Sequence, residues 1–169
     1  MKTSYRLGVI VALLFTTLAG SSQSRSYRIY EQFANREGFT FLSFSKSMID
    51  AVNMNIDEEN KKVTGDLMEI RVLFSNREKN KNHGSLAQNI SERLNNLDYH
   101  KIQLNDAKND DNVEFWIDGN SKRVKECHVL VKNSEDHQFS CLVSFYGNFK
   151  VEDLKSFEKF SRNQADKED

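Results

Sequence analysis

The sequence predicts an α+β fold, in which a largely antiparallel sheet of about six strands carries packed helices. Short segments that alternate apolar and polar side chains outnumber the segments with helical periodicity. Four of the strand-like segments follow one another in the second half of the chain, with only polar turns between them. The helix-like segments lie before, between and after the strands, which gives the order α-β-α-β-α-β-β-β-β-α.

Length and charge are those of one ordinary soluble domain. The chain has 169 residues, with 24 basic and 25 acidic side chains and a net charge of −1. A strongly basic nucleic-acid-binding protein would carry a clear excess of Lys and Arg, so nucleic acid is not expected as a partner. The near-neutral charge and the 12 Phe residues favour a packed core over disorder.

The first residues have the pattern of a secretory signal peptide. Lys2 and Arg6 precede an apolar run, Leu7–Leu18, and the small residues Ala19–Ser22 follow as a cleavage site. Twelve helical residues rise only ~18 Å, against a hydrocarbon core of ~30 Å. We therefore expect cleavage near Ala19 to Ser22 and no transmembrane span in the mature chain, an uncleaved signal anchor being the alternative.

The cleavage region resembles a bacterial lipoprotein box, but Ser21 stands where the lipid-bearing cysteine would be. We therefore expect no lipid anchor and an exported protein, periplasmic or extracellular. The expected organisation is a signal peptide over 1–21, a polar leader over 22–25, a single α+β domain over 26–162 and a frayed polar tail over 163–169.

Three elements are expected first within the domain. Helical spacing predicts a helix over 26–37, ended by Gly38. Residues 39–45 form a strand with aromatic side chains on both faces, which favours a central, covered position in the sheet. A capping box from Ser47 to Asp50 opens a short helix. A polar loop follows over 55–66.

The middle of the chain predicts one strand and one helix. The strand covers 68–75 and directs its apolar side chains to one face: Met68, Ile70, Val72 and Phe74. After a charged loop over 76–83, Ser85 caps a helix with Gln88 three residues on. The apolar stripe of that helix consists of Leu86, Ile90, Leu94 and Leu97.

The second half predicts four strands and a closing helix, with polar turns at 108–112, 118–121 and 133–136. The inward positions of the strands are Ile102 and Leu104; Val113, Phe115 and Ile117; Cys127, Val129 and Val131; and Phe139, Cys141, Val143 and Phe145. The last strand is expected to end at Gly147, and Asn148 is a candidate cap for a helix that buries Val151, Leu154, Phe157 and Phe160.

Four segments of the chain form a recognisable pattern: Gly38-Phe39-Thr40, Phe44-Ser45-Lys46-Ser47-Met48, Glu69-Ile70-Arg71-Val72-Leu73 and Gly147-Asn148-Phe149 with Leu154. Together they resemble an exported family, domain of unknown function 4252, found chiefly in the Bacteroidetes. The resemblance covers Tyr27 to Phe160. It implies export and this order of elements, with no assigned activity and no functional residues to carry over. Some members resemble lipoproteins, and this chain departs from them at Ser21.

Both cysteines fall on inward positions of adjacent predicted strands, which raises the question of a disulfide. If the hairpin places Cys127 directly opposite Cys141, their Cα atoms lie about 4.5 Å apart, within disulfide range. If the register moves by two residues, Cys127 faces Val143 instead and both cysteines stay free and buried. An oxidising compartment favours the bond.

Of the four histidines, His83, His100 and His137 are expected on the surface. His128 lies mid-strand, with Glu126 on the same face, and Ser140 or Ser144 could lie across from it. A general base needs such a nucleophile or an orienting carboxylate within hydrogen-bond reach. A small hydrolase with a site near His128 and Glu126 is therefore one hypothesis.

An apolar cluster shares the strand face of His128: Trp116, Val124, Leu130, Leu142 and Tyr146. Either a helix covers this face, the first or the last one, or a partner does. If the face is exposed, the expected contact surface consists of Trp116, His128, Leu142 and Tyr146.

No motif for a cofactor, a metal or a known catalytic centre is found. The leading hypothesis is an exported, non-enzymatic binding module whose partner is an unknown envelope protein or ligand. The alternatives are the hydrolase just described and a structural component of the envelope.

Overall fold

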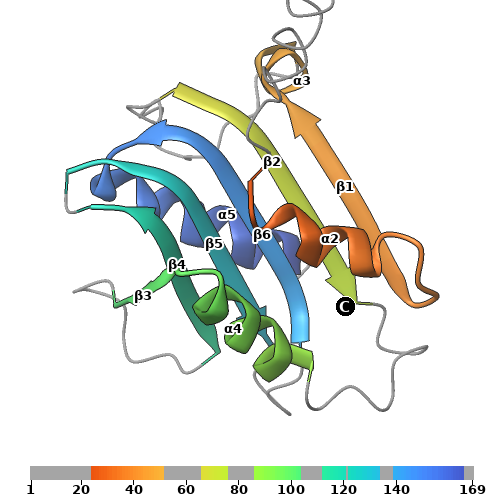
Figure 1. Ribbon diagram of the computed structural model, residues 1–169. Helices are drawn as coiled ribbons and strands as arrows, with labels where there is room; N and C mark the ends of the chain where they lie inside the picture. The colour runs from red at the N-terminus through yellow and green to blue at the C-terminus, as the bar shows by residue number, and fades with distance from the viewer. Residues whose placement is uncertain are drawn as a thin grey trace, which may run out of the picture.

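The computed structural model describes residues 24–51, 66–75, 86–103, 112–120, 122–133 and 139–165. They form one sheet with helices on both faces (Figure 1). The predicted signal peptide over 1–21 lies outside the described residues, as do the charged loop over 76–83, the capping residue Ser85, and most of the loop over 55–66.

The sheet has six strands in the order β1-β2-β6-β5-β4-β3, and every neighbouring pair is antiparallel. The α+β fold class is thereby confirmed. The strands are β1 (Phe39–Ser45), β2 (Asp66–Ser75), β3 (His100–Ile102), β4 (Val113–Gly119), β5 (Val124–Lys132) and β6 (Phe139–Phe149). The last strand along the chain thus lies between β2 and β5, in the middle of the sheet (Figure 1).

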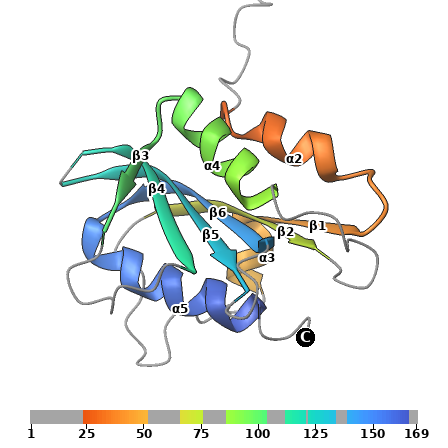
Figure 2. The same ribbon diagram turned by 90° about the horizontal axis from the view of Figure 1, so that it is seen from below.

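Helices cover the two faces of the sheet in pairs (Figure 2). On one face lie α2 (Tyr27–Phe33) and α4 (Leu86–Asn96), and on the other α3 (Lys46–Ala51) and α5 (Leu154–Ala165), the latter preceded by a 3-10 turn, Val151–Asp153. None of the helices in the described part of the chain is long and apolar enough to cross a membrane.

The core between the sheet and α5 holds the inward positions that the second half of the sequence predicts. Phe145 of β6 stacks on Phe157 of α5, with ring centroids 4.0 Å apart. The buried members of this cluster on the central strands and on α5 include Ile70, Val72, Phe74, Phe115, Ile117, Cys127, Val129, Val131, Cys141, Val143, Phe145, Leu154 and Phe157.

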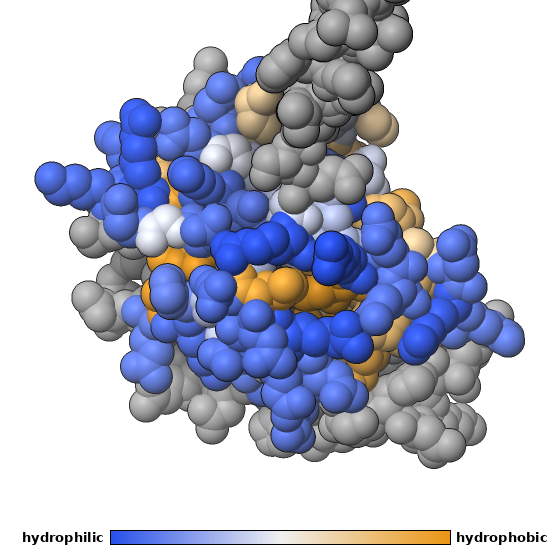
Figure 3. Space-filling view, in the orientation of Figure 1, coloured by the Kyte–Doolittle hydropathy of each residue, from blue (hydrophilic) through white to orange (hydrophobic). Residues whose placement is uncertain are grey.

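A second core fills the space between the sheet and helices α2 and α4. Its buried members are Ile29, Tyr30 and Phe33 of α2, Leu86, Ala87, Ile90 and Leu94 of α4, and the sheet and loop residues Leu73, Tyr99, Trp116, Leu130, Phe139 and Leu142. The outer faces of the helices are mainly hydrophilic, and a band of apolar side chains shows between them (Figure 3). Two separate cores therefore hold three layers together.

The central position expected for the 39–45 strand is wrong, although its bounds are confirmed. β1 is an edge strand that pairs only with β2 in the described sheet. Its aromatic residues lie on both faces because each face has a helical layer: Phe39 and Phe41 join the α2 side and Phe44 joins the α5 side. Apolar side chains on both faces of a strand indicate that both faces are covered. They do not indicate whether both edges of the strand are paired.

Two bulges change the side-chain parity that the sequence predicts. A bulge between Leu67 and Glu69 leaves Met68 51% exposed and puts Leu67 in the core in its place. Another irregularity, between Val131 and Lys132, accompanies the placement of Phe139 on the α2/α4 face instead of beside Cys141.

β6 does not end at Gly147 but continues to Phe149. Gly147 lies opposite Leu67, at the β2 bulge. A Cβ atom at this position would come within 2.1 Å of the Asp66 carbonyl oxygen, so β2 can approach β6 this closely only where a glycine stands. Asn148, offered as a helix cap, is therefore part of the strand.

The disulfide hypothesis is also wrong, because the register of the last hairpin differs from both registers considered. Cys127 pairs with Phe145 and Cys141 with Val131, so the two cysteines are four residues apart along the ladder. That is ~13 Å along a strand, far beyond disulfide range. Both cysteines are free and buried.

Candidate functional site

A fully buried polar pair lies at the centre of the sheet, under α2. His128 of β5 and Ser144 of β6 are directly opposite each other, and both are 0% exposed. Ser144 Oγ lies 2.6 Å from His128 Nδ1, and the phenol of Tyr30, on α2, donates a hydrogen bond to Ser144. Burial lowers the pKa of His128 from 6.5 to about 3, so the imidazole is neutral at neutral pH.

The other nitrogen of the ring faces a carboxylate. His128 Nε2 is 3.6 Å from Glu126 Oε2 and has no hydrogen-bond partner among the described residues. Ser144 Oγ accepts a hydrogen bond from Tyr30, which leaves its own hydroxyl proton available to Nδ1; in that arrangement the ring proton is on Nε2, towards the carboxylate. The opposite tautomer would direct a lone pair at Glu126.

Glu126 is held from one side only. Its Oε2 accepts hydrogen bonds from Ser24 Oγ at 2.6 Å and from Tyr99 OH at 2.7 Å. Its Oε1 has no donor among the residues that the structure describes, and the side chain is 16% exposed. A carboxylate with one satisfied and one open oxygen can accept a further donor from outside the fold.

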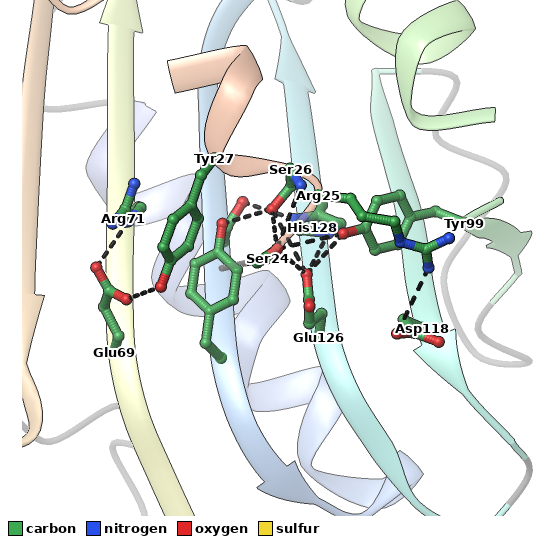
Figure 4. A network of polar contacts seen from close by, with 12 residues as sticks. Ser24, Arg25, Ser26, Tyr27, Glu69, Arg71, Tyr99, Asp118, Glu126 and His128 are labelled. Carbon is green, nitrogen blue, oxygen red and sulfur yellow. Dashed lines mark hydrogen bonds and ion pairs between the residues drawn. The ribbon is translucent and has the colours of Figure 1, made fainter. Parts of the chain in front are cut away.

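A row of three hydroxyl groups, those of Ser24, Ser26 and Tyr146, extends from the Glu126 carboxylate across to β6. Ser24 Oγ lies 2.8 Å from Ser26 Oγ (Figure 4). Ser26 Oγ lies 2.7 Å from the hydroxyl of Tyr146 on β6. Burial raises the pKa of Tyr146 far above its usual value, so its phenol stays protonated. The chain entering α2 is thus fixed to both β5 and β6.

A second cluster lies beside the first, on β2. Arg71 Nε donates to Glu69 at 2.7 Å, Tyr27 OH donates to the same carboxylate, and the guanidinium stacks 3.4 Å from the centre of the Tyr27 ring. Burial would raise the pKa of Glu69, but the hydrogen bonds it accepts outweigh burial and hold that pKa below its usual value. Burial and Glu69 raise the pKa of Tyr27 to about 12. The charges of Glu69 and Arg71 therefore balance each other within this cluster.

Members of both clusters line a surface hollow of about 360 Å³: Ser24, Glu126 and Tyr146 from the first and Tyr27 from the second. It is lined by Ser24, Tyr27, Asp66, Met68, Lys125, Glu126, Tyr146, Gly147 and Asn148. Asp66 is already paired with Lys46, 3.1 Å away, whereas no Lys or Arg within 4 Å balances Glu126 in the described part of the chain. The hollow therefore combines a tyrosine-rich wall with an uncompensated carboxylate.

Comparison with known proteins identifies the family. A family model, Domain of unknown function (DUF4252), matches residues 30–157, well over half of the chain. The chain belongs to the DUF4252 family. No curated protein and no solved structure matches it. The resemblance seen in the sequence is thus confirmed.

The DUF4252 fold covers the face that the sequence offered as a contact surface. Trp116, His128, Leu142 and Tyr146 are 7%, 0%, 0% and 6% exposed, beneath α2 and α4. Of the two alternatives, a helical cover is therefore present, and the first helix is part of it. Only Tyr146 of the four lines the surface hollow.

The residue types of a hydrolase do meet in this DUF4252 chain, at Ser144, His128 and Glu126. Of the two serines considered, the structure selects Ser144. However, Ser144 Oγ has no access to solvent, and Tyr30 occupies its remaining side. A nucleophile must reach a substrate carbonyl, so this closed arrangement cannot turn over a substrate as it stands. The described residues contain no group of three ligands that could hold a metal.

Sequence reasoning missed the residues that bring Glu126 to the hollow. Ser24, Ser26, Tyr27 and Tyr99 carry no motif, and 22–25 read as a leader in front of the domain. The hydroxyl-rich run Ser24–Tyr27, which directly follows the predicted cleavage region, marks that segment but does not connect it with Glu126, and Tyr99 has no such signal. His100, by contrast, lies exposed at β3, as expected.

Proposed function

We propose that this DUF4252 protein is a non-enzymatic binding module of the cell envelope, and that its hollow receives a positively charged amine of its ligand. The observation that carries the proposal is the carboxylate of Glu126. Glu126 lines the hollow, and the hydroxyl groups of Ser24, Tyr99 and Ser26 hold its Oε2. Among the described residues, its Oε1 has no donor and no Lys or Arg lies within 4 Å of the carboxylate.

The chemistry of the walls supports a cation over an anion. An ammonium group gains from a partly desolvated carboxylate and from neighbouring aromatic rings, here those of Tyr27 and Tyr146. Lys125 lines the same hollow, so a ligand that carries both an amine and a carboxylate can satisfy each of the two charges. The closed pair His128–Ser144 favours binding over catalysis, because neither side chain meets solvent.

Small probes test this charge preference directly. The amide spectrum of the isotope-labelled protein is titrated with n-butylammonium, with butyrate and with butanol. We expect butylammonium alone to shift the signals of Ser24, Tyr27 and Glu126 strongly. In Glu126→Gln, the chemical-shift change at the same butylammonium concentration should be at least about tenfold smaller, because the probe loses its charge-assisted hydrogen bond.

Glu31→Gln is the matched control, because Glu31 is an exposed carboxylate on α2 that does not line the hollow. It should bind butylammonium as the unchanged protein does. Equal shifts with all three probes, or a full response in Glu126→Gln, would contradict the proposal.

A further inference from the structure

Two irregularities of the sheet meet at the hollow beside Glu126. The β2–β6 pairing shifts register between Leu67 and Glu69, and the β5–β6 pairing shifts between Val124 and Glu126. Both shifts lie at or next to Gly147 of β6, which lines the hollow. Bulges are over-represented beside active sites, where they redirect a side chain. We therefore consider which side chains these two irregularities bring to the hollow.

The irregularity in β5 places two neighbouring charged side chains at the hollow. In a regular strand, consecutive side chains point to opposite faces of the sheet. Here Lys125 and Glu126 both line the hollow, while Val124 belongs to the core on the α5 side. Lys125 is exposed and has no ion-pair partner among the residues that the structure describes. An ammonium group and a carboxylate thus line the same hollow without an ion pair between them.

The bulge in β2 brings an apolar side chain to the same hollow. Met68 is 51% exposed and lines the hollow, because Leu67 takes its place in the core. The rings of Tyr27 and Tyr146 also line the hollow and meet edge to face, with centroids 5.2 Å apart. Tyrosine rings offer apolar contact area, and a methionine side chain adapts its shape to what it touches. The hollow can therefore hold an aliphatic group beside its charges.

The charges and the size of the hollow fit a small zwitterion. Asp66 is paired with Lys46, 3.1 Å away, which leaves Glu126 and Lys125 as the lining charges that a ligand can pair with. A ligand with one ammonium group and one carboxylate balances both of them. The volume of about 360 Å³ lies at the lower end of the range for small-molecule sites, which is roughly 300–1,000 Å³.

We propose that the ligand of this hollow is an α-amino acid with an apolar side chain. Its ammonium group pairs with Glu126, its carboxylate pairs with Lys125, and its side chain packs on Met68. This inference rests on the amine site of the proposed function. It adds two contacts that a simple amine does not use, one to the lysine and one to the methionine.

The carboxylate contact is tested with leucine and leucinamide. Dissociation constants are measured from amide chemical shifts at about pH 6, below the ordinary α-amino pKa, so that both probes carry an ammonium group. Leucine should bind at least about threefold tighter than leucinamide, which is the scale of a partly exposed ion pair. In Lys125→Gln this preference should vanish, while leucinamide binds at least as tightly as before. Lys122→Gln should keep the preference, because Lys122 is exposed between β4 and β5 and does not line the hollow.

The apolar contact is tested with glycine, which carries both charges but no side chain. Leucine should bind at least about fivefold tighter than glycine, as partial burial of its side chain requires. Met68→Ala should reduce this preference. Met48→Ala is the matched control and should leave it unchanged, because Met48 is 49% exposed on α3 and does not line the hollow. An unchanged melting temperature shows that neither variant has disturbed the fold.

Butylammonium separates a failure of this inference from a failure of the proposed function. If butylammonium binding depends on Glu126 but leucine binds no tighter than leucinamide or glycine, the amino-acid ligand is wrong and the amine site stands. The inference is also overturned if Lys125→Gln keeps the preference for leucine over leucinamide, or if Met68→Ala keeps the full preference over glycine. If no probe depends on Glu126, both proposals fail.

Discussion

At the scale of single residues, burial decides the chemistry of His128. The ring has a serine on Nδ1 and a carboxylate 3.6 Å from Nε2, which are the neighbours that a catalytic base needs. Yet it is 0% exposed, and burial alone lowers its pKa to about 3. In this fold Ser144 holds the ring, and Nε2 faces Glu126 without a hydrogen bond to any described residue.

The buried imidazole makes stability depend on pH. The folded-state pKa of about 3 lies below the unfolded value of 6.5, so the unfolded chain takes up the proton first. The contribution of His128 is complete above pH 6.5 and is lost as the pH falls from 6.5 towards 3. We expect urea unfolding to show at most about 1.4 kcal/mol of loss per pH unit from this group.

His128→Gln should flatten that pH profile, since glutamine does not titrate. Tyr30→Phe is the control, because it removes a buried hydroxyl from the same network but keeps the imidazole, and its profile should keep the original slope. Identical slopes in the unchanged protein and His128→Gln would show that another group is responsible for the pH dependence.

Residue positions were predictable from the sequence where alternation is regular. Phe115, Val129 and Val143 lie on the α5 side because no bulge separates them from the strand pattern. The predicted faces of Met68 and Phe139 were wrong, because a bulge moves the following side chains to the opposite face of the sheet. The residue types at these bulges do not indicate that a bulge is present.

At the scale of elements, one buried carboxylate attaches α4 to the sheet. Glu114 of β4 accepts hydrogen bonds from Ser91 of α4 at 2.7 Å, from Trp116 Nε1 at 3.1 Å and from Lys132 at 2.8 Å. Burial would raise the pKa of Glu114, but the bonds from Lys132, Ser91 and Lys101 outweigh it and lower that pKa to about 2.

We expect Glu114→Gln to destabilise the protein by about 2 kcal/mol, because it leaves buried donors with a weaker acceptor. Amide exchange in α4 should accelerate more than exchange in α5. Since the folded pKa lies below the usual 4.5, the stabilisation is present above pH 4.5 and disappears as the pH falls towards 2. Glu92→Gln, on the exposed side of α4, should leave both quantities unchanged; a similar effect of both substitutions would contradict this role.

Elements were predictable where their signal is local. The apolar stripe of α4 predicts which side of that helix is buried, and the alternation in β4 and β5 predicts which side chains of each strand face the α5 core. Both predictions are confirmed. The position of β1 in the sheet could not be read in the same way, because strand order depends on which segments meet across long stretches of chain.

At the scale of the whole molecule, the reactivity of the two cysteine thiols tests the register of β5 and β6. Cys127 and Cys141 are buried, and burial strongly raises the pKa of the Cys127 thiol. The native protein should therefore have the intact mass of the dithiol even without reductant, and a thiol reagent should label both cysteines only after unfolding. The loss of two hydrogens, or rapid labelling of the native protein, would contradict the register of β5 and β6.

The candidate site was only partly predictable because it is assembled from distant segments. Glu126 and His128 stood out through their shared strand face, and Ser144 was one of two serines considered. Ser24 and Tyr99 could not be added, since they reach Glu126 from separate parts of the chain and no spacing connects them.

The position of β6 also governs when the fold can close. β2 is paired on one side by β1 but on the other by β6, which is synthesised roughly 70 to 80 residues later. Until that strand arrives, one side of β2 and the cores on both faces stay open, so a ribosome or a membrane channel that delivers the chain from its N-terminus handles an incomplete sheet. The last of the six strands to be synthesised therefore completes the centre of the sheet, and the sheet can close only once β6 has emerged.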